Sequence, residues 1–192
     1  MTSHAPFDTA ATTAAPLPGL GRRALAQLRV SLERDLGAGA AAVLQEAGFA
    51  AGEETFAAFT AWLAAKTGVA VPGDLDAAHL ADALDGFFRD IGWGPLRSTM
   101  LTDGVLAFDS EAWAESTNTP SSLAPACHLS CGLLADLLGR VAGHVVAVME
   151  VECRSRGDAR CRFLAGSPET LGALYERLAA GQSYASALGL EG

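Results

Sequence analysis

The chain has 192 residues and half of them are apolar, so it is long enough to bury the core of one globular domain. Its 22 Asp and Glu residues outnumber its 13 Lys and Arg residues, which leaves a formal net charge of −9 at pH 7. This charge argues against nucleic-acid binding, which depends on neutralising phosphates.

The first nineteen residues, MTSHAPFDTAATTAAPLPG, have no basic start and no continuous apolar run. We therefore expect a disordered tail over residues 1–19 rather than a secretory signal. No later stretch offers the twenty or so apolar residues that a membrane span requires. These features predict a soluble cytoplasmic protein, a compartment in which thiols stay reduced and clustered cysteines favour a metal site over disulfides.

The first half of the remaining chain has a helical pattern. Apolar residues recur three and four positions apart between Leu20 and Val71, which predicts amphipathic helices. Glycines at 37, 39, 48, 52 and 68 mark breaks between about three helices. A fourth helix is expected from Asp76 to Ile91. We thus predict a helical part over residues 20–92 of a single domain that spans 20–192.

The period changes after Pro95, and residues 93–192 are expected to form an α/β part. Two short strands are predicted around Asp103-Gly104, a dipeptide favoured in tight hairpins. After a polar loop over 116–125, a helix is expected over 127–138. Residues 144–152 and 161–164 form the arms of a second predicted hairpin, and a final helix starts after Ser167. The order predicts an α+β fold with an antiparallel sheet of about four strands and helices on one side.

All four cysteines lie between residues 127 and 161. Zinc takes four ligands at tetrahedral corners, and thiolates suit it well. Cys153 and Cys161 lie on opposite arms of the second predicted hairpin, so strand pairing would bring them together. Cys127 and Cys131 lie one helical turn apart. Four thiolates would make the simplest zinc site.

Glu150 is an alternative fourth ligand, because a carboxylate in a Val-rich strand requires a partner. Strict alternation would put Glu150 and Cys153 on opposite faces, so their joint ligation requires a twist or a bulge near Val151. Spacing alone does not choose between Cys131 and Glu150. Glu152 is expected to be a solvated strand residue.

A longer motif resembles a known family. The pattern C-H-x-S-x-G-x(6)-G-R-x(9)-E-x-x-C-x-x-x-G-D-x-x-C-x-F resembles the 4-vinyl reductase domain, and its positions are Cys127, His128, Ser130, Gly132, Gly139, Arg140, Glu150, Cys153, Gly157, Asp158, Cys161 and Phe163. This domain also forms the sensory module of bacterial regulators that respond to aromatic hydrocarbons. The resemblance implies a closed, structural zinc site whose ligands are Cys127, Glu150, Cys153 and Cys161.

The resemblance also implies positions for a ligand pocket. In the phenol-sensing relatives, the positions of Cys131 and Val148 face the ligand, and a histidine lies at about the place of His79. Both Cys131 and Val148 are small here, which favours a larger or differently shaped ligand than phenol. Three further apolar residues are predicted for the core and could line a cavity: Trp93, Leu106 and Phe108.

We expect a module that binds an apolar, aromatic or tetrapyrrole-like small molecule beside a structural zinc, and that forms a homodimer. One alternative is an accessory role in bacteriochlorophyll synthesis, linked to vinyl-group reduction, and another is an assembly protein of the trafficking-complex fold. Independent catalysis is disfavoured, because the only glycine-rich match to a nucleotide-binding motif, GLGRRA at 19–24, follows the tail and not a strand.

Overall fold

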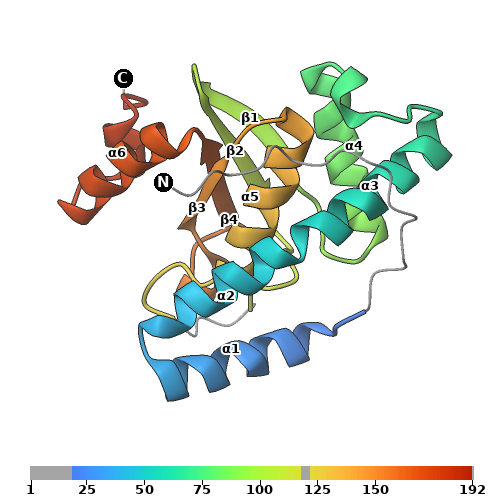
Figure 1. Ribbon diagram of the computed structural model, residues 1–192. Helices are drawn as coiled ribbons and strands as arrows, with labels where there is room; N and C mark the ends of the chain where they lie inside the picture. Colours follow the sequence, from blue (N-terminus) through green and yellow to red (C-terminus); the bar gives the residue numbers. More distant parts are fainter. Residues whose placement is uncertain (1–18, 118–121, 192) are drawn as a thin grey trace, which may run out of the picture.

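The computed structural model describes residues 19–117 and 122–191 (Figure 1). Except for Gly19, the tail predicted over residues 1–19 therefore lies outside the described residues. No helix in these two ranges is long and apolar enough to cross a membrane. The helices and strands, in chain order, are α1 (Arg22–Leu36), α2 (Gly39–Ala50), α3 (Gly52–Thr67), η1 (Pro72–Asp74), α4 (Ala77–Asp90), β1 (Arg97–Thr102), β2 (Val105–Ser110), α5 (His128–Ala142), β3 (Ala147–Glu152), η2 (Arg154–Arg156), β4 (Cys161–Gly166), α6 (Pro168–Ala179) and α7 (Tyr184–Ala187).

The three predicted N-terminal helices and the fourth helix are present. The α2–α3 break falls at Ala51, and Gly48 lies inside α2. Asp76 begins α4 as expected, because its side chain accepts a hydrogen bond from the backbone N–H of His79. Helix α5 runs past Gly139 and ends before Gly143, which adopts the left-handed conformation (φ 72°).

The predicted antiparallel sheet has four strands in the order β1-β2-β4-β3. Side chains alternate along each strand, so Phe108 and Phe163 lie on one face while Val105 and Leu164 lie on the other. The α+β fold class is thus confirmed.

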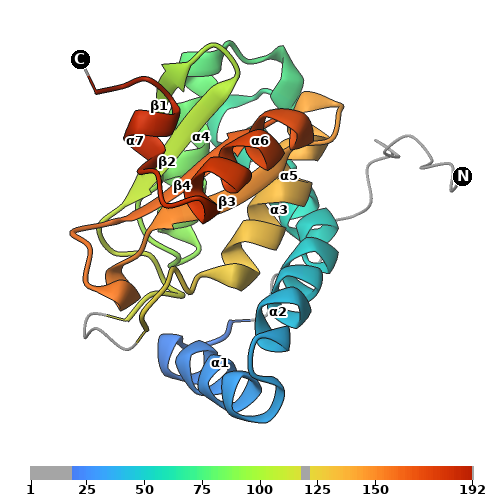
Figure 2. The same cartoon turned by 90° about the vertical axis from the view of Figure 1, so that its left-hand side faces the viewer.

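The expectation that all helices cover one side of the sheet is wrong. Helices α3, α4 and α5 pack on the face of Phe108 and Phe163. Helices α6 and α7 pack on the opposite face through Leu171, Leu174 and Ala187, as Figure 2 shows. The physical reason is that the strands are apolar on both faces, so each face requires a helical cover.

Two glycines let α2 and α5 approach closely. A Cβ atom on Gly132 would lie 2.0 Å from the carbonyl oxygen of Gln45, and one on Gly48 would lie 1.9 Å from that of Leu129. Larger residues would push the helices apart. This crossing holds α5 against the N-terminal helices, with its first turn near the ends of β3 and β4 (Figure 1).

Candidate metal centre and adjoining pocket

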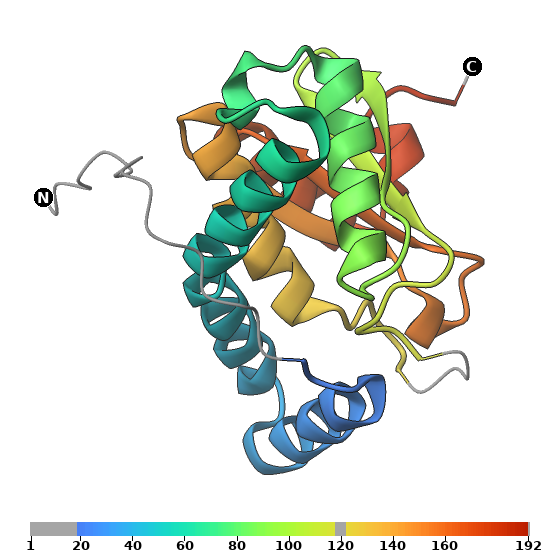
Figure 3. The ribbon, with the colours of Figure 1, turned by 90° about the vertical axis from the view of Figure 1, so that its right-hand side faces the viewer.

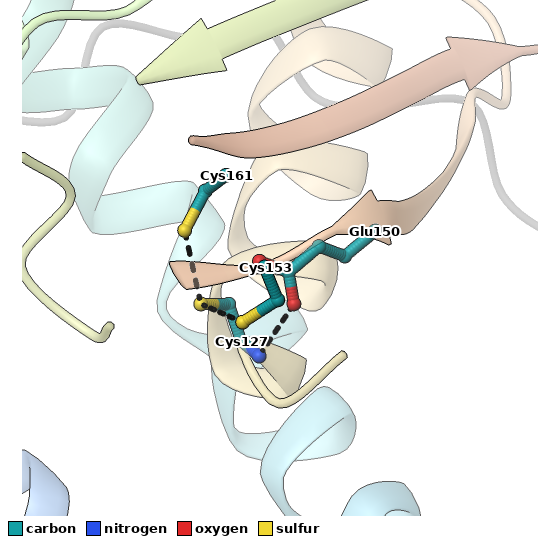
Figure 4. Close-up of side chains that lie close together, drawn as sticks. All are labelled: Cys127, Glu150, Cys153 and Cys161. Atoms are coloured by element: carbon teal, nitrogen blue, oxygen red, sulfur yellow. Dashed lines mark hydrogen bonds between the residues drawn. The ribbon is translucent and has the colours of Figure 1, made fainter. Parts of the chain in front are cut away.

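Three thiols and one carboxylate converge at the start of α5 (Figure 4). Cys127 is the residue before α5, Glu150 lies on β3, Cys153 follows β3, and Cys161 begins β4. One ligand atom from each lies within 4.8 Å of the others. Cys131 lies outside this group, so of the two candidates for the fourth ligand the structure brings Glu150 to the three thiols.

A break in the strand pairing makes this convergence possible. Glu150 pairs with Phe163 and Glu152 pairs with Arg162, with a register shift between them. The shift places Val151 and Glu152 away from the thiols and returns Cys153 to the side of Glu150. The bulge predicted near Val151 is therefore confirmed.

The geometry fits a tetrahedral ion. The sulfur of Cys127 lies 3.8 Å from that of Cys153 and 3.9 Å from that of Cys161. Sulfur atoms bound at 2.3 Å to a tetrahedral zinc would be separated by about 3.8 Å. All three thiols are fully buried. The cluster thus has the size and the chemistry of a Cys₃Glu zinc site.

Glu150 has the hydrogen bonding of a metal ligand. Its Oε2 accepts hydrogen bonds from the backbone N–H groups of Ala126 (2.9 Å) and Cys127 (2.8 Å). Its Oε1 is buried and has no hydrogen-bond partner among the described residues. Because buried carboxylate oxygens are nearly always partnered, this oxygen fits a bound cation.

The four groups compete for protons when no cation is present. Burial, followed by the charge of Cys153, raises the pKa of Glu150 to about 8. Hydrogen bonds with Cys153 and Cys161, together with burial, raise the pKa of Cys127 well above its ordinary value. Hydrogen bonds from the same neighbours lower the pKa of Cys153. A divalent cation would remove this conflict, because it stabilises all the anionic forms together.

Glu115, which sequence reasoning missed, caps α5 and leaves the Cys127 thiol free for the cluster. Its carboxylate accepts from the backbone N–H groups of Leu129 (3.1 Å) and Ser130 (2.7 Å) and from the Ser130 hydroxyl (2.5 Å). Trp113 Nε1 donates to the same hydroxyl at 2.6 Å. Burial raises the pKa of Glu115 to about 7, although these hydrogen bonds and Arg29 oppose the shift. No local pattern indicates this cap, since Glu115 is not in the turn before α5.

A pocket of about 350 Å³ adjoins the metal cluster, between α2, α5 and β3. Cys131 and Val148, both predicted to face a ligand, line it. The other lining residues are Gln45, Glu46, Phe49, Gly132, Ala135 and Ala147. Burial raises the pKa of the Cys131 thiol well above its ordinary value, so the thiol presents an uncharged, weakly polar wall.

The structure places the other predicted ligand residues elsewhere. His79 is exposed at the start of α4, where its Nδ1 lies 2.8 Å from Asp76 Oδ2. Phe108 is buried in the core, and Leu106 is half-buried against it. Trp93 is half-buried beside Trp113, with a ring separation of 5.4 Å. These four residues do not line the pocket that Cys131 and Val148 share.

Glu152 corrects one expectation, because it is not a solvated strand residue. It is half-buried, and Arg160 donates to both of its oxygens at 2.9 and 3.1 Å. The Tyr184 hydroxyl donates to one of them, and Arg162 links Tyr184 to Asp109. This ion-pair network fastens α7 to the sheet face opposite the metal cluster.

Comparisons with solved structures identify the fold. The phenol-responsive sensory domain of the transcription activator PoxR with phenol is 20% identical, with a TM-score of 0.58 over 85% of this chain and 82% of that one. A trafficking protein particle complex subunit 3 from Naegleria fowleri, covalently bound to palmitic acid, is 13% identical, with a TM-score of 0.61 over 76% and 91%. A vinyl-4-reductase family protein from Methanocaldococcus jannaschii is 23% identical, with a TM-score of 0.37 over 44% and 55%.

No curated protein matches the chain. At these identities the first two solved structures show a shared fold. A family model for the 4-vinyl reductase domain matches residues 109–167, a range that contains all four residues of the metal cluster. Over this range the chain is a 4-vinyl reductase domain, so the family that its sequence motif resembles is confirmed.

Proposed function

We propose that the protein is a sensory or carrier module that binds an apolar small molecule beside a structural zinc ion. The pocket between α2, α5 and β3 carries the proposal. Two of its walls, α5 and β3, also present the metal cluster: Cys131 follows Cys127 by one turn, and Val148 precedes Glu150 by two residues. A filled metal site would therefore hold two walls of the pocket in a fixed arrangement.

Cys127, Glu150, Cys153 and Cys161 would hold the zinc. Three thiolates and one carboxylate fill four tetrahedral positions, so no position is left for an activated water. When bound, the ion supplies a cross-link between α5 and the β3–β4 hairpin. The four side chains orient that cross-link, and burial of the thiols keeps water out.

The pocket favours a ligand that is mostly apolar and has one polar group. Phe49, Cys131, Ala135 and Val148 offer apolar surface, while the exposed Gln45 and Glu46 offer polar groups at the rim. A volume of about 350 Å³ lies at the lower end of the ~300–1,000 Å³ range of ligand sites. The likeness to a sensory domain that holds phenol supports this ligand class.

Binding of defined probes to the full zinc-loaded chain tests the proposal. Phenol, palmitic acid and protoporphyrin IX represent a small aromatic, a chain-like and a tetrapyrrole ligand, and isothermal titration calorimetry measures each. We expect saturable binding of at least one probe. Ala135→Trp should weaken it about tenfold or more by filling the pocket, whereas Ala142→Trp, at the exposed end of the same helix, should not. If a folded, zinc-loaded protein bound none of the three, the proposal would be wrong.

We also propose that two copies pair through the N-terminal helices. Large apolar side chains are exposed on α1 and α2: Leu28, Val30, Leu36 and Val43. An exposed apolar surface of this kind marks protein contacts. Light scattering at micromolar concentration should report a dimer mass, and a monomer mass would contradict the pairing.

A further inference from the structure

Helix α1 is anchored by arginine side chains more than by apolar packing. Leu25 and Arg29 are its two buried residues. Arg22 donates to the carbonyl oxygens of Ala112 (3.0 Å) and Trp113 (3.4 Å) in the loop after β2. Figure 3 shows α1 beyond the end of the sheet, below the first turn of α5. Its position therefore depends on a few polar contacts.

Arg29 makes the deepest of these contacts. Its side chain is only 4% exposed, and its Nη1 donates to the Ser155 hydroxyl at 3.3 Å. Ser155 is fully buried in η2, two residues after Cys153. The same hydroxyl accepts the backbone N–H of Thr117 at 3.0 Å. A buried guanidinium is costly unless its acceptors stay in place, so α1 depends on the position of η2.

The position of η2 depends in turn on Cys153. The backbone N–H of Cys153 donates to Asp158 Oδ2 at 2.6 Å, and its carbonyl accepts from Arg156 and Asp158, which closes the η2 turn directly onto the metal cluster. If the cation were lost, the buried thiols and Glu150 would lose their common partner. The segment from Cys153 to Ser155 would then loosen, and Arg29 would lose its buried acceptor.

From this chain of contacts we infer that Arg29 couples the docking of α1 to the occupancy of the metal centre. A bound metal holds Ser155 in place and keeps α1 docked. Metal loss releases α1 and uncovers Leu25 together with the buried Ala40 and Leu44 of α2. The inference rests on the proposed zinc centre and adds a metal-dependent conformational change to it.

Hydrogen exchange of the full chain, read by mass spectrometry with and without a zinc chelator, tests the coupling. Metal content is measured on the same samples. We expect chelation to speed exchange of the α1 amides by about tenfold to hundredfold, the range for losing a buried charge-assisted hydrogen bond. The amides of α6, on the opposite sheet face, serve as the reference and should change less.

Arg29→Met separates coupling from general loosening, because it keeps the length of the side chain and removes the guanidinium. With zinc still bound, its α1 amides should exchange as fast as those of the chelated wild type, and chelation should add little more. Arg34→Met is the matched control, since Arg34 lies on the same helix and its side chain is 67% exposed. It should behave like the wild type.

Three outcomes would overturn the inference. Zinc removal that leaves α1 exchange unchanged would reject the coupling and leave the metal centre standing. Equal acceleration in α1 and α6 would show that the whole chain unfolds and that α1 has no response of its own. A chain that binds no zinc would reject the metal centre and the coupling with it.

Discussion

Glu150 and Glu152 are the same residue type on one strand, two positions apart, yet they have opposite environments. The register shift between them sends Glu150 toward the thiols and Glu152 to the other face of the sheet. Arg160 and Tyr184 bond both oxygens of Glu152. For Glu150, one oxygen has two backbone donors and the other has no hydrogen-bond partner among the described residues.

The pKa values of the two carboxyls differ accordingly. Burial raises the pKa of Glu150 to about 8. Burial also acts to raise the pKa of Glu152, but hydrogen bonds from Arg160 and Tyr184 outweigh it and the pKa falls. A carboxylate whose partners are complete stabilises the fold, whereas a buried carboxylate with a free oxygen marks a place where a ligand is expected.

Cys153→Ser should have the largest effect. It removes a thiolate from the centre of the cluster, so zinc content should fall from one per chain to near zero. Because metal binding is coupled to folding, the free energy of unfolding should fall by about 4 kcal/mol or more. Elemental analysis and calorimetry measure both quantities. Full zinc content in this variant would exclude Cys153 as a ligand.

Glu150→Gln should weaken zinc binding while the fold persists. The amide keeps an oxygen for the N–H groups of Ala126 and Cys127 but is a poorer metal ligand. We expect the affinity to fall by more than about 100-fold, beyond the 10–100-fold typical of losing an outer-shell partner. Competition with a chromophoric chelator measures it. Unchanged affinity would remove the distinction between Glu150 and Glu152.

Glu152→Gln is the matched control, and it should keep one zinc per chain. Its network is partly exposed, so screening limits the expected loss of unfolding free energy to about 1 kcal/mol. The folded-state pKa of Glu152 lies below the unfolded value, so its contribution is present above about pH 4.3 and is lost as pH falls through the folded-state value. The difference in Tm between wild type and variant should therefore shrink at acidic pH. A difference that instead grew on acidification would contradict the assigned ion pairs.

Cys131→Ser should have the smallest effect. Its thiol lines the pocket and is not among the four converging donors, so zinc content should stay near one per chain. Placing a hydroxyl in a buried site should cost about 1 kcal/mol of unfolding free energy. Zinc lost here but kept in Glu150→Gln would show that Cys131 is the fourth ligand.

Much of the candidate site could be predicted from residue spacing. The second hairpin places Cys153 and Cys161 on facing arms, and the mismatch in alternation between Glu150 and Cys153 requires the bulge that the structure contains. Local capping was equally visible: Ser167 accepts the Thr170 N–H at the start of α6. Such features depend on neighbours a few residues apart, which is why the sequence shows them.

The sequence by itself determined the helices, the strands, the two hairpins and the residues of the metal cluster, because hydrophobic period, turn chemistry and motif spacing are local properties. Only the tertiary structure decided which sheet face α6 covers, since both faces of the strands are apolar. The same holds for Glu115 on the first turn of α5 and for Arg29 beside Ser155, 126 residues away. These polar side chains find partners across the fold, and no local period encodes a contact that chain packing creates.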